Sequence, residues 1–381
     1  MSKIKKLFIS ILNLPLYLIA NLTPKDENIW LFGAWFGEKY ADNSKYLFEY
    51  VNKNYPEIRA IWLTKNKDVY KLVQSKNYEV CYRYGIKAIY LGLKAKYSIF
   101  VQANDVDNML FLNNDNTQQI QLWHGTPLKK IGFDTFTNHK QSNRIKSFLF
   151  PFLHDNFDLM IAMSKEDKKN FNTAFKSNII YITGYPRNDN LFKKTKKDKF
   201  HILYLPTFRG NVGSRIDLLT DNNFDYTKYQ KWLSHNNSLL DFKMHPVNQP
   251  TDNVLNKIMD YKNINFLTEV DVAEILPQID ILITDYSSVY FDYLLTDKPI
   301  IFASFDYEKY ITEDRELYYI YDEVTPGPKC KNWDEVLTWI EKFKNNPALY
   351  AKERKSAKDR FHKYQDARSC ERVYNKIINL G

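Results

Sequence analysis

At 381 residues the chain is too long for one ordinary hydrophobic core, and its length predicts two domains of about 150–200 residues each. Its apolar content of 44% and charged content of 26% are those of a folded globular protein. The net charge of +9 favours anionic partners, but the lysines come without a recognition-helix or RNA-binding signature, which disfavours nucleic acid. Cys81, Cys330 and Cys370 lie far apart without CxxC spacing, so we expect neither a zinc site nor a disulfide. We expect the protein to be in the reducing cytoplasm.

The first 22 residues combine a basic end with a short apolar stripe. Lys3, Lys5 and Lys6 precede apolar residues at helical spacing, namely Leu7, Phe8, Ile11, Leu12, Leu18 and Ile19. The run falls short of the ~20 apolar residues that a transmembrane helix needs, and no small-residue cleavage site of a signal peptide follows it. We therefore expect residues 1–22 to form a membrane-interfacial amphipathic helix. A helix that packs only on its own domain is the alternative.

Short apolar runs alternate with helical stretches along the rest of the chain. The predicted strands of the first half are 29–32, 60–63, 98–102, 119–122, 159–162 and 179–183, and those of the second half are 201–205, 242–244, 264–266, 279–283 and 300–302. This alternation predicts two doubly wound parallel sheets. We expect an N-terminal Rossmann-like domain over 23–190, a lysine-rich linker over 191–200, a C-terminal Rossmann-like domain over 201–345 and a helical segment over 346–381. This α/β organisation is typical of a GT-B transferase, whose two Rossmann-like domains face a central cleft.

The stretch 279–293 is predicted to be a strand, a turn and a helix. Its turn, Thr284 to Ser288, contains Asp285 and the hydroxyls of Thr284, Ser287 and Ser288. Ligands of open α/β sheets bind at carboxyl ends of strands, and the free N–H groups of a first helical turn attract anions. The turn therefore suits a phosphate, although a serine here is also an ordinary helix N-cap.

A histidine follows the predicted strand 119–122. The near-neutral pKa of His124 suits the removal of a proton from a hydroxyl, although a lone histidine is more often structural. Gly125 lets the backbone turn sharply, and Lys129 would reach a phosphate.

Three other predicted strand ends carry polar side chains as well. Arg187 suits bidentate contact with a phosphate. Thr207 and Arg209 follow the first strand of the second half, and Lys243 and His245 follow the next. Each alone is compatible with a solvated loop. As a group without metal-ligand spacing, they are harder to explain by coincidence than any one of them alone.

Five motifs in this order resemble one family. They are His-Gly-Thr-x-x-Lys at 124–129, Gly-Tyr-Pro-Arg-Asn-Asp at 184–189, Pro-Thr-Phe-Arg at 206–209, Lys-x-His-Pro at 243–246 and Thr-Asp-Tyr-Ser-Ser at 284–288. Together they resemble the CDP-glycerol glycerophosphotransferases, the family of teichoic acid primases and polymerases.

The resemblance implies transfer of glycerol phosphate from CDP-glycerol to a hydroxyl of a membrane-linked teichoic-acid-type or capsule acceptor, with release of CMP. It implies a polyprenyl-diphosphate-linked or polymeric acceptor at the cytoplasmic face of the cell membrane, where the protein would be peripheral. The implied catalytic residues are His124 and His245. The implied donor-binding residues are Thr207, Arg209, Lys243, His245, Thr284, Asp285, Ser287 and Ser288. Gly125, Thr126, Lys129 and Arg187 would contact the acceptor or a phosphate, and neither a metal nor a cofactor is expected.

Several alternatives stay open at this point. Asp105-x-Asp107 follows a strand, as does the metal-binding triplet of GT-A glycosyltransferases. A GT-B glycosyltransferase that uses a nucleotide sugar, a ribitol-phosphate transferase of the same family and a non-catalytic membrane-surface protein are the others. Whether one polyol unit or many are added is also open.

Overall fold

The computed structural model describes residues 3–135, 150–153, 157–207, 209, 218–244, 254–255, 258, 260–268, 270–313 and 316–380, with the backbone alone for 3–7 and 311–313. The chain divides into two compact units, each described here by itself. Unit 1 comprises Met1–His124, Gly132–Asp189 and Asp366–Gly381, and unit 2 comprises Gly125–Ile131 and Asn190–Gln365.

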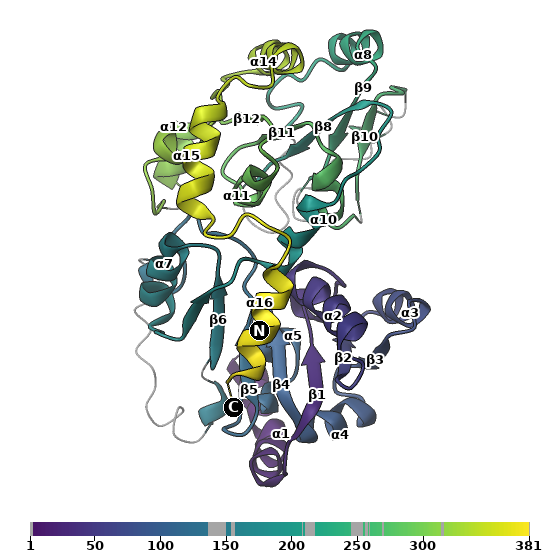
Figure 1. Cartoon of the computed structure of the whole chain (residues 1–381), viewed down its shortest axis with the longest axis vertical. Coiled ribbons are helices and arrows are strands. Elements are labelled where there is room, and N and C mark those ends of the chain that lie inside the picture. The colour runs from purple at the N-terminus through teal and green to yellow at the C-terminus, as the bar shows by residue number, and fades with distance from the viewer. Residues whose placement is uncertain are drawn as a thin grey trace. The chain divides into compact units, whose positions relative to one another are not determined.

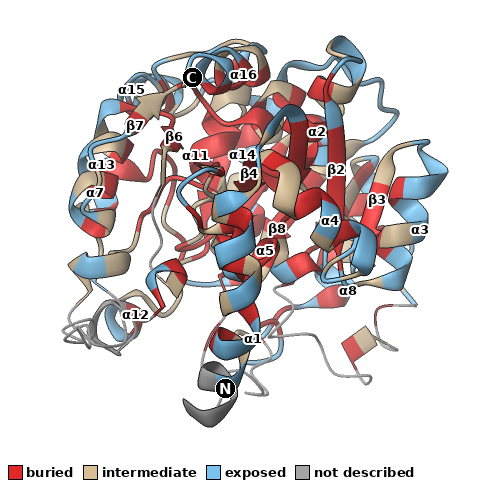
Figure 2. Cartoon of the chain, turned by 90° about the horizontal axis from the view of Figure 1, so that it is seen from below, coloured by how far each residue is buried: buried red, intermediate tan, exposed pale blue. Residues whose placement is uncertain are grey.

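Unit 1 is built on a parallel sheet of short apolar strands. In the described part of the unit, seven strands lie in the order β3-β2-β1-β4-β5-β6-β7, and every neighbouring pair is parallel. They are β1 (Asp26–Phe32), β2 (Arg59–Thr64), β3 (Glu79–Tyr82), β4 (Ala95–Phe100), β5 (Gln118–Gln121), β6 (Leu159–Ala162) and β7 (Ile180–Ile182). The strands are largely buried, in red in Figure 2, as expected for a parallel sheet covered on both faces.

Helices from both ends of the chain cover this sheet. Their bounds are α1 (Lys3–Leu22), α2 (Asp42–Asn54), α3 (Lys67–Ser75), α4 (Ile86–Lys94), the short α5 (Asn104–Asp107), α7 (Lys165–Phe175) and α16 (Ser369–Ile378). Short 3-10 turns are η1 (Trp35–Gly37), η2 (Leu110–Leu112), η3 (Gly132–Asp134), η4 (Pro151–Leu153) and η5 (Pro186–Phe192). Although α16 is the last helix, its Tyr374 ring stacks on Tyr55 at 3.7 Å, and α16 lies against the first sheet (yellow in Figure 1).

Unit 2 repeats this plan with a smaller parallel sheet. Its described residues give five strands in the order β10-β9-β8-β11-β12. They are β8 (Phe200–Leu205), β9 (Ser238–Phe242), β10 (Ile264–Phe266), β11 (Ile281–Thr284) and β12 (Ile300–Phe302). The helices are α8 (Tyr226–His235), α10 (Val272–Ile275), α11 (Val289–Tyr293), α12 (Tyr307–Glu313), α13 (Tyr321–Val324), α14 (Trp333–Asn345) and α15 (Ala351–Phe361), with turns η6 (Leu276–Gln278) and η7 (Leu294–Thr296).

The strand order of each sheet fixes where polar loops meet. In unit 1 the chain order reverses between β1 and β4, and in unit 2 it reverses between β8 and β11. Loops that follow two such strands leave the sheet in opposite directions, and ligands of doubly wound folds bind at this switch point. The loops after β1, β4 and β5 therefore form the first region of interest, and those after β8 and β11 form the second.

Helix α1 has one buried and one exposed face. Tyr17 and Ala20 are buried in the core of unit 1, and the Tyr17 ring lies 5.0 Å from that of Phe152. Phe8 and Leu12, by contrast, are 61% and 57% exposed. Among the described helices, none is both long enough and apolar enough to cross a membrane.

The predicted elements and boundaries need four corrections. Residues 346–381 were expected to form one segment, but α15 belongs to unit 2 and α16 to unit 1. Gly125–Ile131 was expected in the first domain and belongs to unit 2, because it forms a β-bridge from Lys129 to Leu317. The strand predicted at 242–244 begins earlier, as β9, and edge strand β3 was not predicted at all.

Candidate functional site

The switch point of unit 1 holds the predicted base in a strained turn. Trp123 has φ +51° and Gly125 has φ +143°, a region that favours glycine. The Asn43 amide stabilises this turn by donating to the carbonyls of Leu122 and Trp123 at 3.0 and 2.9 Å. His124 is thus held at the end of β5, where the sequence placed it.

The hydrogen bonds of His124 define which ring nitrogen can act as a base. Its Nδ1 lies 3.1 Å from the carbonyl oxygen of Val101, in the loop after β4. Because a carbonyl only accepts, Nδ1 carries the proton in the neutral ring and Nε2 keeps its lone pair. Burial lowers the pKa of His124, although Asp42 opposes this shift, so the ring is neutral at pH 7. A neutral imidazole with an available Nε2 suits proton abstraction.

Asp42 was not predicted, yet it is central to this loop cluster. Its carboxylate accepts from Trp35 Nε1 at 3.1 Å and from Arg187 Nη1 at 2.7 Å. Arg187 Nη1 also donates to the carbonyl of His124 at 3.0 Å. The structure therefore places Arg187, the predicted phosphate contact, in a largely buried ion pair that braces the His124 turn.

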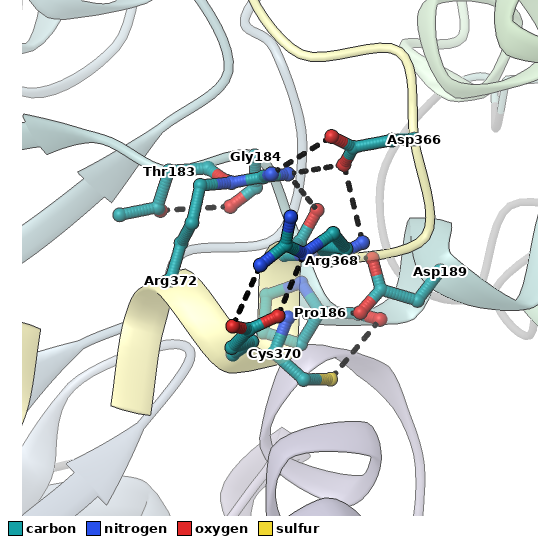
Figure 3. Close-up of polar contacts among 10 residues, drawn as sticks. Thr183, Gly184, Pro186, Asp189, Asp366, Arg368, Cys370 and Arg372 are labelled. Atoms are coloured by element: carbon teal, nitrogen blue, oxygen red, sulfur yellow. Dashed lines mark hydrogen bonds and ion pairs between the residues drawn. The ribbon is translucent and has the colours of Figure 1, made fainter. Parts of the chain in front are cut away.

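Asp189, at the end of the motif 184–189, contacts the C-terminal helix (Figure 3). Asp189 accepts from the backbone N–H groups of Ser369 and Cys370, both at 2.8 Å, and so caps the start of α16. Arg372 of α16 donates to the carbonyl of Thr183 at 2.7 Å. Gly184 has φ +80°, and a Cβ there would lie 2.5 Å from the Ser369 hydroxyl oxygen. These contacts explain why α16 belongs to unit 1.

The predicted acceptor-contact residues after His124 belong to unit 2, whereas His124 belongs to unit 1. Thr126 is fully buried, and Lys129 lies over the ring of Tyr310, 5.2 Å from its centroid. The carbonyl of Leu128 accepts from the backbone N–H of Tyr318 at 2.9 Å. Residues 125–131 therefore belong to unit 2, and this segment begins directly after His124.

Asp285 organises the switch point of unit 2. Its Oδ1 accepts from the backbone N–H groups of Thr207 and Tyr286 at 2.8 and 2.5 Å, and its Oδ2 accepts from Arg209 Nη2 at 2.8 Å. Thr284 Oγ1 donates to the carbonyl of Leu205 at 2.7 Å. Thr284 and Asp285 thus join the ends of β8 and β11 and bring Thr207 and Arg209 together, as the strand order implies.

The guanidinium of Arg209 forms hydrogen bonds with two carboxylates and a backbone carbonyl of the protein. Besides Asp285, its guanidinium contacts Asp306 through Nε at 2.7 Å, and its Nη1 donates to the Thr207 carbonyl at 2.8 Å. Burial opposes the charge, but Asp285 and Asp306 raise the pKa of Arg209 above its usual value. It also lies 4.9 Å from the ring centroid of Tyr286. Arg209 is therefore first of all the partner of two carboxylates.

Hydroxyl and ammonium groups gather at the same strand ends. Thr207 Oγ1 is buried and has no hydrogen-bond partner among the described residues, which is unusual for a buried hydroxyl. Ser287 and Ser288 are partly buried, and the Ser288 side chain makes no capping bond to α11. Lys243 is buried after β9, and its Nζ donates to the carbonyl of Thr268 at 2.9 Å. His245 lies outside the described residues.

Asp105-x-Asp107 does not form the metal-binding triplet of the rival prediction. Asp107 points into unit 1 and accepts from the backbone N–H groups of Phe36, Val101 and Gln102 at 2.8, 3.0 and 2.7 Å. The described residues contain no cluster of three acidic, histidine or cysteine side chains that would hold a metal ion. The function of Asp107 is therefore to fix the loops after β1 and β4.

Comparisons with known proteins cover nearly the whole chain. Residues 16–379 match a family model described as CDP-Glycerol:Poly(glycerophosphate) glycerophosphotransferase. A teichoic acid poly(glycerol phosphate) polymerase of Bacillus spizizenii is 30% identical over 354 residues, which cover 86% of this chain and 87% of that protein. A teichoic acid glycerol-phosphate transferase of Staphylococcus aureus is 26% identical over 377 residues and is covered to 93%, as is this chain. The structure of the wall teichoic acid polymerase TagF shares the fold, with a TM-score of 0.76 at 22% identity, over 100% of this chain and 98% of that one.

Proposed function

The chain belongs to the CDP-glycerol:poly(glycerophosphate) glycerophosphotransferase family, and from this premise we propose that it transfers glycerol phosphate from CDP-glycerol to a hydroxyl of a membrane-linked, teichoic-acid-type acceptor. The observation that carries the proposal is the base geometry of His124. Its Nδ1 is bonded to a carbonyl, and its Nε2 is the nitrogen left to accept a proton. His124 lies inside residues 16–379, the part of the chain that matches the family model.

The reaction follows from that geometry. His124 Nε2 takes the proton of the acceptor hydroxyl, whose oxygen forms a new bond to the phosphorus that carries glycerol. The bond from this phosphorus to the bridging oxygen breaks, and CMP leaves with the electron pair. Such phosphoryl transfers depend mainly on positioning and on stabilisation of charge. Removal of one positioned base costs on the order of 10²–10⁴ in rate.

The donor diphosphate is assigned to the strand ends of unit 2. The Thr207 hydroxyl has no hydrogen-bond partner in the part of the chain that the structure describes, which supports this assignment, since a phosphate oxygen would accept its hydrogen bond. Ser287 and Ser288 follow β11 and Lys243 follows β9, the two strands on either side of β8, and His245 follows Lys243 in the chain. In this proposal Arg209 and Asp285 shape the loop that presents Thr207.

Base and donor belong to different units, and both must reach one phosphorus atom. In the GT-B arrangement predicted from the sequence, the two domains face a common cleft, where base and donor would meet. We include this arrangement in the proposal. We also propose that transfer proceeds without a metal ion, with lysine, histidine and hydroxyl groups stabilising the phosphate charge.

The exposed face of α1 supports peripheral attachment to the membrane, and we propose the cytoplasmic face because the family resemblance implies it. Exposed apolar side chains lie along it at helical spacing, namely Phe8, Ile11, Leu12, Leu18, Ile19 and Leu22. Such a face binds in the interfacial region of a bilayer, and each nearby lysine adds about 1 kcal/mol on an anionic surface. This position would bring the enzyme to a polyprenyl-diphosphate-linked or polymeric acceptor.

The test is release of CMP by purified protein from CDP-glycerol, with and without a glycerol-phosphate-primed lipid acceptor. We expect release that depends on the acceptor. CDP-ribitol and UDP-linked sugars serve as parallel donors. Faster turnover of CDP-ribitol would make the chain a ribitol-phosphate transferase, and turnover of a UDP-sugar alone would overturn the proposal.

A further inference from the structure

We propose that Asp107 is a positioning residue for His124 and acts through the peptide group that joins Val101 to Gln102. The N–H of this peptide donates to Asp107 Oδ2 at 2.7 Å. The carbonyl of the same peptide lies 3.1 Å from His124 Nδ1 and accepts its proton. Carboxylate, peptide and imidazole thus form one continuous chain of hydrogen bonds, which we call the Asp107 relay. The inference rests on the proposed role of His124 as the base.

The relay strengthens the base by polarising the peptide. A carboxylate that accepts from a peptide N–H increases the negative charge on the carbonyl oxygen of that peptide, and chains of hydrogen bonds reinforce one another in this way. The Val101 carbonyl then holds Nδ1–H more firmly and stabilises the imidazolium that forms when Nε2 takes a proton. An aspartate in direct contact with a catalytic histidine has the same two effects.

Additional contacts keep the relay in place. Asp107 is completely buried, and its carboxylate also accepts from the N–H groups of Val101 and Phe36 at 3.0 and 2.8 Å. The Gln121 amide donates to the carbonyl of Gln102 at 2.9 Å and accepts from the N–H of Trp123 at 2.8 Å. Gln121 therefore ties the Val101–Gln102 turn to the turn that carries His124. The geometry of the base is fixed from both sides.

The charges around the ring set the direction of the expected effect. Burial lowers the pKa of His124, Asp42 raises it and Arg187 lowers it further. Burial raises the pKa of Asp107 to about 6, so Asp107 is ionised at pH 7. Loss of the Asp107 charge removes stabilisation of the imidazolium, and the pKa of His124 should then fall.

The variant Asp107→Asn keeps the shape of the side chain and removes its charge. We expect kcat to fall by about 10–100-fold, the loss that is typical when the outer hydrogen-bond partner of a metal-bound histidine is removed. Binding of CDP-glycerol should be unchanged, and the acid limb of the rate profile should move to lower pH together with the pKa of His124 measured by NMR. Asp105→Asn is the matched control, because Asp105 is an exposed carboxylate of the same helical turn. It should leave kcat and the pKa of His124 unchanged.

Measurements on the wild-type protein test the relay without any variant. The ¹⁵N spectrum of the neutral His124 ring should show the proton on Nδ1, because the Val101 carbonyl beside this nitrogen can only accept. A proton on Nε2 would overturn the relay. If His124→Ala transfers at the wild-type rate, the proposed base is wrong. If His124 is essential while Asp107→Asn keeps the wild-type kcat and His124 pKa, only the relay is wrong.

Discussion

Replacing Arg209 by alanine should destabilise unit 2, because the guanidinium is the partner of two carboxylates. The side chains of Arg209 and Asp285 are 10% and 1% exposed, and their atoms lie 2.8 Å apart. Removal of one partner of a buried ion pair costs about 3–5 kcal/mol. Asp285 keeps two backbone N–H bonds and Asp306 is 35% exposed, so we expect the lower end of this range. For a unit of this size, a loss of ~3 kcal/mol lowers Tm by roughly 6–12 °C.

Thr207→Val is the matched variant at the same strand end. It removes a buried hydroxyl that has no hydrogen-bond partner among the described residues, so Tm should not fall. If this hydroxyl binds the donor diphosphate, the affinity for CDP-glycerol should drop about tenfold or more, since a hydrogen bond to a charged group contributes roughly 1.5–3 kcal/mol. Thermal unfolding followed by circular dichroism, and calorimetry with CDP-glycerol, measure the two quantities. If Arg209→Ala keeps the wild-type Tm and loses only donor affinity, the ion-pair argument is refuted and Arg209 contacts the phosphates.

Four further predictions follow from the site and from α1. His124→Ala should lower kcat by about 10²–10⁴ and leave CDP-glycerol affinity intact, because the base acts on the acceptor proton; a change of only a few-fold would remove His124 from this role. In the wild-type enzyme, kcat/KM should fall as the pH drops through a pKa below the usual 6.5 of histidine, since burial favours the neutral ring and the base must be unprotonated; an acid limb above that pH would contradict the assignment. Transfer should survive EDTA, and activity that is lost to EDTA and restored by Mg²⁺ or Mn²⁺ would mean a metal-dependent mechanism. Leu12→Asp with Ile19→Asp should abolish sedimentation with anionic vesicles at unchanged Tm, because both side chains are exposed on α1; unchanged sedimentation would exclude this face as the anchor.

The fold was predictable because buried parallel strands are apolar and short. Strands 264–266 and 300–302 match β10 and β12, and the helix predicted after Ser288 appears as α11 followed by η7. The proximity of Thr207 and Asp285 also follows from strand ends that meet at a switch point. These features depend on local pattern and on general rules of sheet topology.

The parts that were missed depend on contacts between distant residues. Asp42 is a non-glycine residue with φ +64°, and its partner Arg187 is 145 positions away in the chain. Asp107 belonged to a pattern that suggests a metal site, and only its burial against three N–H groups shows its function. The two acidic partners of Arg209, Asp285 and Asp306, are 76 and 97 positions away from it and could not be predicted from the local sequence. The position of α16 in unit 1 depends on Asp189, which caps it.

Mass spectrometry of the acceptor tests the central claim most directly. Purified enzyme, CDP-glycerol and a lipid-linked glycerol-phosphate acceptor should give an acceptor that is heavier by whole glycerol-phosphate units, with one CMP released for each unit. The same mixture with His124→Ala should leave the acceptor mass unchanged. Release of CMP without growth of the acceptor, or growth by any unit other than glycerol phosphate, would contradict the account.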